Sequence, residues 1–279
     1  MGALSNLTVI EYSQFASGPY CGKLLADLGA NVIKIETPGI GDKARSWGPF
    51  PQDLPHPEKS GLFLYLNTNK QSVTLNLETA MGAKIYTELA KRVDIIIVSN
   101  SPKELKRLGL DYESLHKSNP GLVMTSITPF GQSGPYQDYK GCDLVNFNIS
   151  GMASHNPAEG VDNIDQKPPL KAPIHVPDLM TGLTAAICTV SAVISRKKSG
   201  LGQHIDLSQQ EALACLGRTE LAAFSYKGTQ PTRKKGKKRS GAMMYPCKDG
   251  YIVMSATEGA FWPGLLDMLG NPEWVKEEW

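Results

Sequence analysis

The chain has 279 residues, of which 41% are hydrophobic and 20% charged, and its formal net charge at pH 7 is +2. This composition is ordinary for a globular protein and indicates neither a disordered chain nor a nucleic-acid-binding one. The length suffices for a full hydrophobic core, in one large domain or in one domain and part of another. A small molecule is therefore the expected partner, rather than a nucleic acid.

Cysteine usage and hydropathy indicate the cellular location and the kinds of site to expect. The five cysteines are scattered, odd in number and never in a Cys-x-x-Cys pair, which argues against a disulfide framework or a zinc site. The five histidines also lack metal-binding spacing. The chain opens without a leader pattern, and its longest apolar stretch, Leu179 to Ile194, is short and rich in Thr and Ser for a membrane span. We expect a cytoplasmic protein that uses no membrane and no metal.

The first 36 residues predict a strand, a helix and a second strand. Leu7–Tyr12 is a β-branched run, Gly18 and Pro19 then precede a stretch with apolar residues at helical spacing, and that stretch ends at Gly29. Asn31–Glu36 is again rich in β-branched residues. The order is typical of a βαβ unit.

The same alternation continues along the chain. Strands are expected at 73–77, 94–98, 122–127 and 203–207, and helices at 79–92, 101–108, 141–150, 178–198 and 209–226. The segment 38–60 is rich in Pro and Gly and is expected to form a long surface loop. Strands that alternate with helices predict an α/β fold with a largely parallel sheet covered by helices.

A change in composition marks a domain boundary after residue 226. The segment 227–240 carries the basic run Arg233–Arg239, which is more simply a solvated linker than a nucleic-acid site because the rest of the chain is not basic. A strand at 251–256 and a helix at 261–269 follow. We therefore expect a large α/β domain at 1–226, a linker at 227–240 and the beginning of a smaller domain at 241–279.

Four features could take part in chemistry, but each also has a simpler structural explanation. The turn Ser13–Tyr20 presents backbone N–H groups at a helix N-terminus, where an anion is stabilised, yet it has no glycine-rich nucleotide motif and is equally explained as a tight turn. Asp178 opens the best-defined helix, and from position alone a helix cap is the simpler interpretation. It could also attack a thioester carbonyl, with the helix N-terminus keeping it ionised. Cys142 is more simply a small packed residue than a nucleophile, and Asp143 can be a cap.

Several short motifs, taken in order, carry a family resemblance. They are Ala16–Pro19, Leu24–Ala30 with Val32–Glu36, Asn67–Ser72, Arg107–Gly109, Gly131–Pro135, Pro177–Gly182, Gly200–Gln203 with Ile205 and Asp206, and Cys247–Ile252. Because it contains these motifs in this order, the chain resembles the class III CoA-transferases of the CaiB/BaiF type. The family includes formyl-CoA:oxalate, carnitine and bile-acid CoA-transferases and, as isomerising relatives, the α-methylacyl-CoA racemases.

The resemblance implies a fold and a reaction. The large domain would contain a Rossmann-like parallel sheet, and two chains would form an interlocked homodimer. Asp178 would be the nucleophile that carries CoA from an acyl-CoA donor to a carboxylic acid, with coenzyme A as substrate and no permanently bound cofactor. The residues implied to contact CoA are Ala16, Ser17, Leu75, Asn76, Asn100, Ser101, Arg107 and Lys140.

The chain also departs from the family pattern. Thr37 stands where many relatives have an arginine, and Cys142 stands where the racemases have a histidine, which disfavours 2-methylacyl-CoA epimerization. No glycine-rich run resembles the loop that covers the aspartate in formyl-CoA transferase. The chain ends before family members do, so a truncated, non-catalytic CoA-binding chain is a third alternative.

Overall fold

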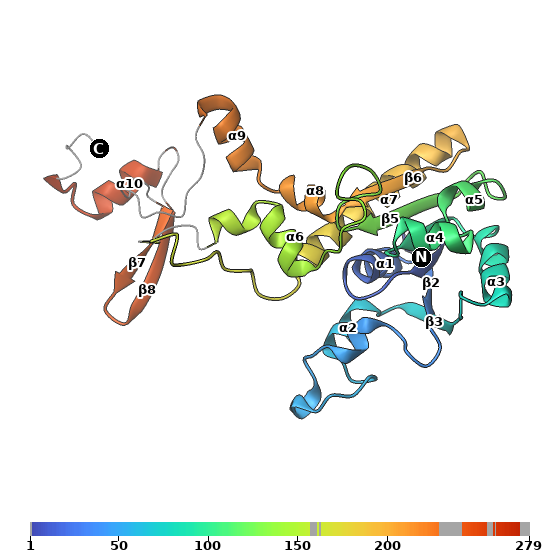
Figure 1. Ribbon diagram of the computed structural model, residues 1–279. Coiled ribbons are helices and arrows are strands. Elements are labelled where there is room, and N and C mark those ends of the chain that lie inside the picture. Colours follow the sequence, from blue (N-terminus) through green and yellow to red (C-terminus); the bar gives the residue numbers. More distant parts are fainter. Residues whose placement is uncertain are drawn as a thin grey trace.

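The computed structural model describes residues 2–156, 161, 163–228, 242–255, 259 and 261–273. Its main element is a six-stranded sheet with the order β3-β2-β1-β4-β5-β6, in which every neighbouring pair is parallel (Figure 1). The strands are β1 (Thr8–Tyr12), β2 (Asn31–Glu36), β3 (Lys70–Thr74), β4 (Ile95–Val98), β5 (Val123–Thr128) and β6 (His204–Ser208). The predicted α/β fold with a parallel sheet is confirmed.

Helices connect and cover these strands. They are α1 (Ser17–Asp27), α2 (Gly61–Leu66), α3 (Ala80–Ala90), α4 (Pro102–Leu108), α5 (Tyr112–His116), α6 (Asp143–Ile149), α7 (Val176–Ser199), α8 (Gln209–Ala214), α9 (Arg218–Lys227) and α10 (Phe261–Met268). Short 3-10 helices occupy Lys43–Ser46, Pro51–Asp53 and Met152–His155, and β7 (Ala242–Cys247) pairs antiparallel with β8 (Gly250–Ser255).

The core lies on both faces of the sheet, because side chains along a strand alternate between the two faces. On one face Val9 and Ile95 pack with Leu25 of α1 and Val193 of α7. On the other face Ile10 and its neighbours pack against the side chains of α3, α4 and α5. The central strands β1 and β4 are thus buried on both sides, which explains their nearly continuous hydrophobic sequences.

The strand order determines where a ligand can bind. The chain moves from β1 outward to β2 and β3, and then returns to place β4 on the other side of β1. The loops that leave β1 and β4 therefore run in opposite directions and open a crevice at their carboxyl ends. In this fold class that crevice is the usual ligand site.

A buried ionic network lies below the turn that follows β1. Glu11, Lys34, Asp42 and Lys70 each expose at most 2% of their side chains, and they pair in the sequence Asp42–Lys34–Glu11–Lys70, with a nitrogen–oxygen distance of 2.7 Å at each step. Burial opposes the ionisation of Glu11, but the two ammonium groups outweigh it and hold the pKa of Glu11 below its usual value. The network joins three strands to the loop after β2.

The long helix α7 is the predicted helix at 178–198, extended by two residues at its amino end and by one at its carboxyl end. By length and composition it could cross a membrane, yet it packs against α1 and β5, and the hydroxyl of its Thr189 lies 2.7 Å from that of Thr125. Gly200, with φ of 73°, ends the helix as predicted. We conclude that α7 is a core helix of the α/β layer.

Three sequence predictions need correction. The single helix expected at 209–226 is two helices, because the chain turns at Leu216 and Gly217. The strand expected at 73–77 is β3 at 70–74, an edge strand whose side chains are mostly exposed, so hydrophobicity does not mark its bounds. The helices α2 and α5 were not predicted, since each has fewer than seven residues.

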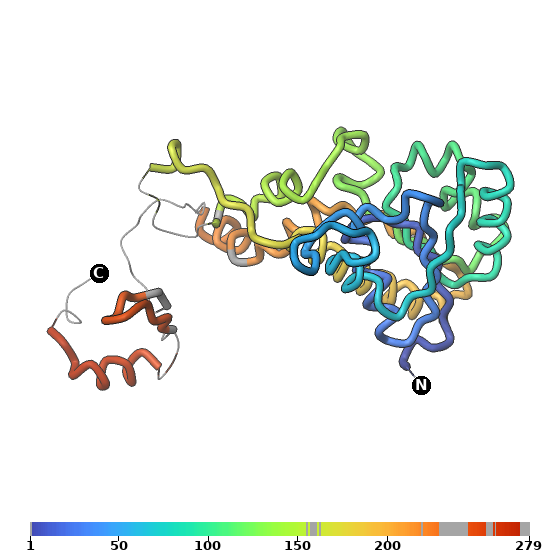
Figure 2. Tube along the Cα trace, turned by 90° about the horizontal axis from the view of Figure 1, so that it is seen from below, coloured from blue at the N-terminus to red at the C-terminus, as the bar shows by residue number. Residues whose placement is uncertain are grey.

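The segment after α9 is described only in part. Figures 1 and 2 show the β7–β8 hairpin and α10 to one side of the large sheet. The basic run 233–239 lies outside the described residues, so the linker and the domain boundary stay predictions.

Candidate active site

The crevice at the carboxyl ends of β1 and β4 contains a cavity of about 560 Å³. It is lined by Tyr12, Gln14, Phe15, Ala16, Ser17, Thr37, Lys43, Asn76, Leu77, Glu78, Ser99, Asn100, Ser101, Glu104, Ile127, Pro129, Gly141, Cys142, Asp143, Asp178 and Gln209. This volume is in the range of small-molecule sites. Its lining contains both polar and apolar side chains.

The first turns of two long helices face this cavity. Ser17 begins α1 and Asp178 lies in the first turn of α7, and both residues line the wall. Neither helix has a side-chain cap, so their N-terminal N–H groups carry partial positive charge that favours an anion. Among the described residues that line the cavity, Lys43 is the only lysine or arginine. An anionic ligand would thus depend on backbone groups as well as on Lys43.

Asp178 is almost completely buried, with 6% of its surface exposed. It is the third residue of α7 behind the N-cap position His175, and its side chain makes no capping hydrogen bond, so the simple interpretation as a helix cap is wrong. Its Oδ1 accepts a hydrogen bond from Nε2 of Gln209 at 3.0 Å, and the same Nε2 donates to Oγ of Ser17 at 3.2 Å. Within the described part of the chain, Oδ2 of Asp178 accepts no hydrogen bond.

The electrostatic surroundings of Asp178 favour its protonated form. Burial, reinforced by the nearby carboxylate of Asp143, raises the pKa of Asp178 to about 7, against the opposing effects of the Gln209 hydrogen bond and of Lys171. The expectation that the helix N-terminus keeps this carboxyl ionised is contradicted by the raised pKa, because burial opposes ionisation more strongly. Near neutral pH the carboxylate and carboxylic acid forms of Asp178 are therefore present in similar amounts.

This raised pKa predicts a stability change in Asp178→Asn. The folded pKa of about 7 lies above the unfolded value of 3.8, so the unfolded chain loses this proton first as the pH rises. The free energy of unfolding should then fall between about pH 4 and about pH 7, by an amount on the order of 4 kcal/mol. We expect Asp178→Asn to raise the melting temperature at pH 8 but not at pH 4, and equal effects at both pH values would contradict the assignment. Asp165→Asn, at an exposed position, is the matched control.

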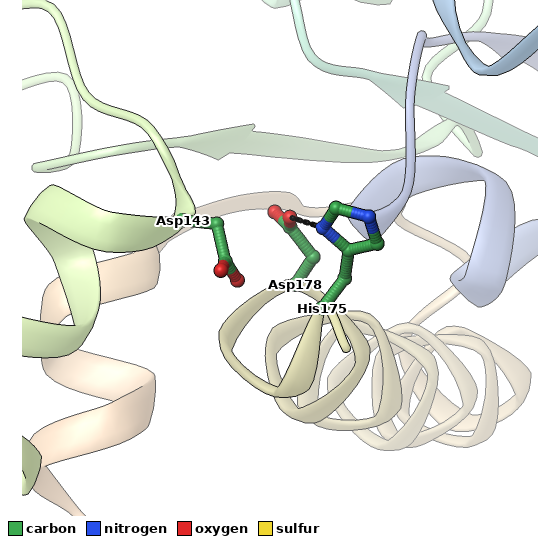
Figure 3. A group of neighbouring side chains, drawn as sticks. All are labelled: Asp143, His175 and Asp178. Carbon is green, nitrogen blue, oxygen red and sulfur yellow. Dashed lines mark ion pairs between the residues drawn. The ribbon is translucent and has the colours of Figure 1, made fainter. Parts of the chain in front are cut away.

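Asp143 and His175 lie beside Asp178 (Figure 3). Lys171 forms an ion pair with Asp143 at 2.5 Å, and Nδ1 of His175 lies 3.9 Å from Oδ2 of Asp178. One ligand atom from each of the three residues lies within 4.8 Å of the others, so the group has the oxygen and imidazole donors of a divalent-cation site. The ammonium of Lys171 already supplies a positive charge there.

Close packing of α1 on α7 explains the glycine four residues after Asp178. A Cβ on Gly182 would lie 2.5 Å from the backbone oxygen of Ser17 and 3.0 Å from Cβ of Tyr20. Any larger residue must push the two helices apart and separate Ser17 from Asp178.

Gly182→Ala is therefore expected to lower the free energy of unfolding by about 1–3 kcal/mol and to reduce ligand binding and activity. Gly264→Ala is the matched control, because a Cβ there meets no atom within 4 Å, and we expect it to change stability by less than about 1 kcal/mol. Urea unfolding of both variants measures the difference. Equal stabilities would show that the helix contact is not close.

The comparisons with known proteins agree with this architecture. The sequence profile of CoA-transferase family III matches residues 4–279. The chain belongs to CoA-transferase family III. It is 32% identical to the succinate–glutarate CoA-transferase of Agrobacterium fabrum over 96% of the chain, and 32% identical to the succinyl-CoA:glutarate CoA-transferase of Mus musculus over 99%.

The chain spans 66% and 62% of the lengths of these two relatives, slightly less than two thirds of each. It is also similar to the crystal structure of a CAIB/BAIF family protein from Brucella suis. That similarity has a TM-score of 0.81 and 30% identity, and covers 99% of this chain and 72% of the other. The structural match therefore includes the sheet and the helices around it.

The structure brings most of the predicted site residues of this CoA-transferase family member to the cavity. Those that line it are Ala16, Ser17, Asn76, Asn100, Ser101 and Asp178. Leu75 packs instead against the core, Arg107 pairs with Glu78 on the cavity rim, and Lys140 is exposed outside the described lining. That the eight residues contact CoA stays a prediction.

Sequence reasoning missed three residues of this CoA-transferase family III site. Gln209 directly follows β6, and its position after a strand of the parallel sheet could have placed it at the same edge as the β1 and β4 loops. His175 was considered only as one of five histidines without metal-binding spacing, although it stands three residues before Asp178. Lys43 comes from the long loop after β2, where no periodicity predicts which side chains face inward.

Proposed function

We propose that this chain transfers coenzyme A from an acyl-CoA to a carboxylic acid, with Asp178 as the nucleophile. The observation that carries the proposal is the unpartnered Oδ2 of Asp178, buried at the wall of a cavity of suitable size. A buried carboxylate oxygen without a hydrogen bond is costly unless a ligand uses it. Because the chain belongs to CoA-transferase family III, we take this ligand to be a CoA thioester.

The reaction would proceed by exchange of acyl bonds. The carboxylate of Asp178 attacks the thioester carbonyl, the carbon–sulfur bond breaks, and an acyl-aspartyl anhydride and CoA thiolate form. The thiolate then attacks the aspartyl carbonyl, which releases the donor acid and leaves an aspartyl-CoA thioester. The acceptor carboxylate repeats these two steps in reverse order, which restores the Asp178 carboxylate and forms the new acyl-CoA. Each step forms one activated acyl bond, a thioester or an anhydride, as it breaks another, so no ATP is required.

The residues around Asp178 each have a role in the proposed reaction. Gln209 holds one oxygen of Asp178 and leaves the other for attack. Burial removes water that would hydrolyse the anhydride, and the N–H groups at the start of α1 and α7 face the negative charge that develops. CoA would lie along Ala16, Ser17, Asn76, Asn100 and Ser101 on the cavity wall.

The relatives suggest the substrate class. Those named above are a succinate–glutarate and a succinyl-CoA:glutarate CoA-transferase, and others are named for citramalate and mesaconate. We infer that succinyl-CoA is the donor and a dicarboxylic acid the acceptor. We also propose that the chain acts as a homodimer in the cytoplasm.

A donor-by-acceptor matrix tests this function. The chain is incubated with succinyl-CoA, glutaryl-CoA or a formyl-CoA donor and each of several mono- and dicarboxylic acids, and the CoA thioesters are separated by liquid chromatography. We expect new thioesters with dicarboxylic acceptors, without ATP, and with the ping-pong kinetics of a covalent intermediate. Saturable CoA binding without any new thioester would instead favour a non-catalytic CoA-binding chain.

A further inference from the structure

His175 is the neighbour of Asp178 that the proposed reaction leaves without a task. It is the N-cap residue of α7, but its side chain makes no capping hydrogen bond. Its Nδ1 is buried without a hydrogen-bond partner among the described residues, and so is Oδ2 of Asp178. These two atoms lie 3.9 Å apart and face each other (Figure 3). The distance between these two unpaired atoms is therefore less than 1 Å longer than a hydrogen bond.

Two aromatic rings pack against the imidazole of His175. The ring of Phe15 lies edge-on at 4.8 Å between centroids, and the ring of Trp47 lies at 5.4 Å. Phe15 itself has a φ of 71°, in the left-handed region that costs free energy for a residue with a side chain. Its N–H donates a hydrogen bond of 3.0 Å to Oδ1 of Asp42, the carboxylate at the end of the buried ionic network. The ionic network therefore holds the backbone of Phe15 in place. Phe15, together with Trp47, in turn restricts the orientation of the His175 ring.

The charges around the ring suit a neutral imidazole. The charged groups that face it are Asp178 on α7, Asp143 on α6 and Lys171 on the segment before α7, while Phe15 and Trp47 are uncharged. Burial lowers the pKa of His175, Asp143 opposes this effect and Lys171 reinforces it. A neutral ring carries one N–H, and an ionised Asp178 can only accept, so the Nδ1–H tautomer matches this neighbour.

We propose that His175 is a positioning residue that donates a hydrogen bond from Nδ1–H to Oδ2 of Asp178 and holds the carboxylate in its attacking orientation. This inference rests on the proposed function of Asp178 as nucleophile. Gln209 would fix Oδ1, and His175, after a small approach from 3.9 Å, would occupy one lone pair of Oδ2 and leave the other for the attack. The carboxylate plane then no longer rotates. The hydrogen bond also favours the ionised form, which is the form that attacks.

Three substitutions separate this role from simple packing. In His175→Asn the amide nitrogen occupies nearly the position of Nδ1, in His175→Gln it reaches that of Nε2, and His175→Phe keeps the contacts with Phe15 and Trp47 but has no donor. If the hydrogen bond matters, kcat should fall about 10- to 100-fold in the Phe and Gln variants and only a few-fold in the Asn variant. If packing alone matters, the Phe variant should be active and the Asn variant impaired. His56→Gln, at an exposed residue, is the control.

A second readout does not depend on turnover. Carboxyl 13C NMR of aspartate-labelled protein, with the Asp178 signal identified by its loss in Asp178→Asn, reports the pKa of Asp178 directly. We expect this pKa to rise by about one unit in the Phe and Gln variants and to stay near that of the parent in the Asn variant. An unchanged pKa in all three variants, or a Phe variant as active as the parent, would overturn the role of His175. A parent chain without transferase activity would contradict the proposed function instead, and the NMR titration would still decide the hydrogen bond.

Discussion

Asp178→Asn is expected to abolish CoA transfer, with a loss in kcat of about 10⁴-fold or more. The substitution removes the nucleophilic oxygen while keeping the shape of the side chain and an oxygen that can accept from Gln209. Because such a nucleophile forms the covalent intermediate, its loss cannot be compensated by the remaining groups of the site. The measurement is the initial rate of thioester exchange with the best donor and acceptor from the substrate matrix.

The same variant should still bind coenzyme A. Its dissociation constant, measured by titration calorimetry, is expected to stay within about threefold of the parent value, since the nucleophile acts on the reacting bond rather than on the nucleotide. Asp165→Asn, at an exposed position outside the described cavity lining, should keep full activity. An Asp178→Asn variant with more than about a tenth of the parent rate would exclude this carboxylate as the nucleophile.

Lys34→Met is expected to cause the largest loss of stability, about 3–5 kcal/mol in the free energy of unfolding. Lys34 is 1% exposed and its ammonium lies 2.7 Å from both Glu11 and Asp42. Methionine has a similar length but no charge, so Asp42 would lose its ion-pair partner and Glu11 would keep only Lys70. A buried carboxylate without a partner costs far more than an exposed one.

The matched control is Lys23→Met. Lys23 also forms an ion pair at 2.7 Å, with Asp27, but Asp27 is 37% exposed, and we expect a change of less than about 1 kcal/mol. Chemical denaturation of both variants gives the comparison. Equal losses would show that the buried network is no more important than a surface pair. Because the Asp42 end of the network anchors Phe15, Lys34→Met should also weaken the contact between Phe15 and His175 in whatever fraction stays folded.

The fold was predictable because the hydrophobic pattern of the central strands has one simple cause. β1 and β4 are buried on both faces, so their sequences are nearly continuous apolar runs, and the helices α3 and α4 begin at the capping residues Thr79 and Ser101. β3 was misplaced because it lies at the edge of the sheet, where mostly exposed side chains give no such pattern. The break between α8 and α9 falls at Gly217, and a single glycine within a helical pattern does not by itself end a helix.

The candidate site was predictable only as far as motifs mark it. The aspartate in Pro-Asp-x-x-x-Gly was found from the family resemblance, and the structure adds a physical reason for both ends of the motif. Pro177 suits the first turn of α7, and Gly182 lets the Ser17 carbonyl approach. The environment of Asp178 was not predictable, because Gln209, Asp143 and His175 reach it from different elements. Its raised pKa depends on their distances, which no local pattern in the sequence encodes.

Intact-protein mass spectrometry after incubation with the donor acyl-CoA tests the central claim most directly. A mass increase of one acyl group or one CoA is expected in the parent chain, within a peptide that contains Asp178, and no increase is expected in Asp178→Asn. Hydroxylamine should convert the adduct to a hydroxamate at Asp178, since it cleaves both anhydrides and thioesters. A chain that transfers CoA but shows no adduct at Asp178, or carries the adduct on another residue, would contradict the account.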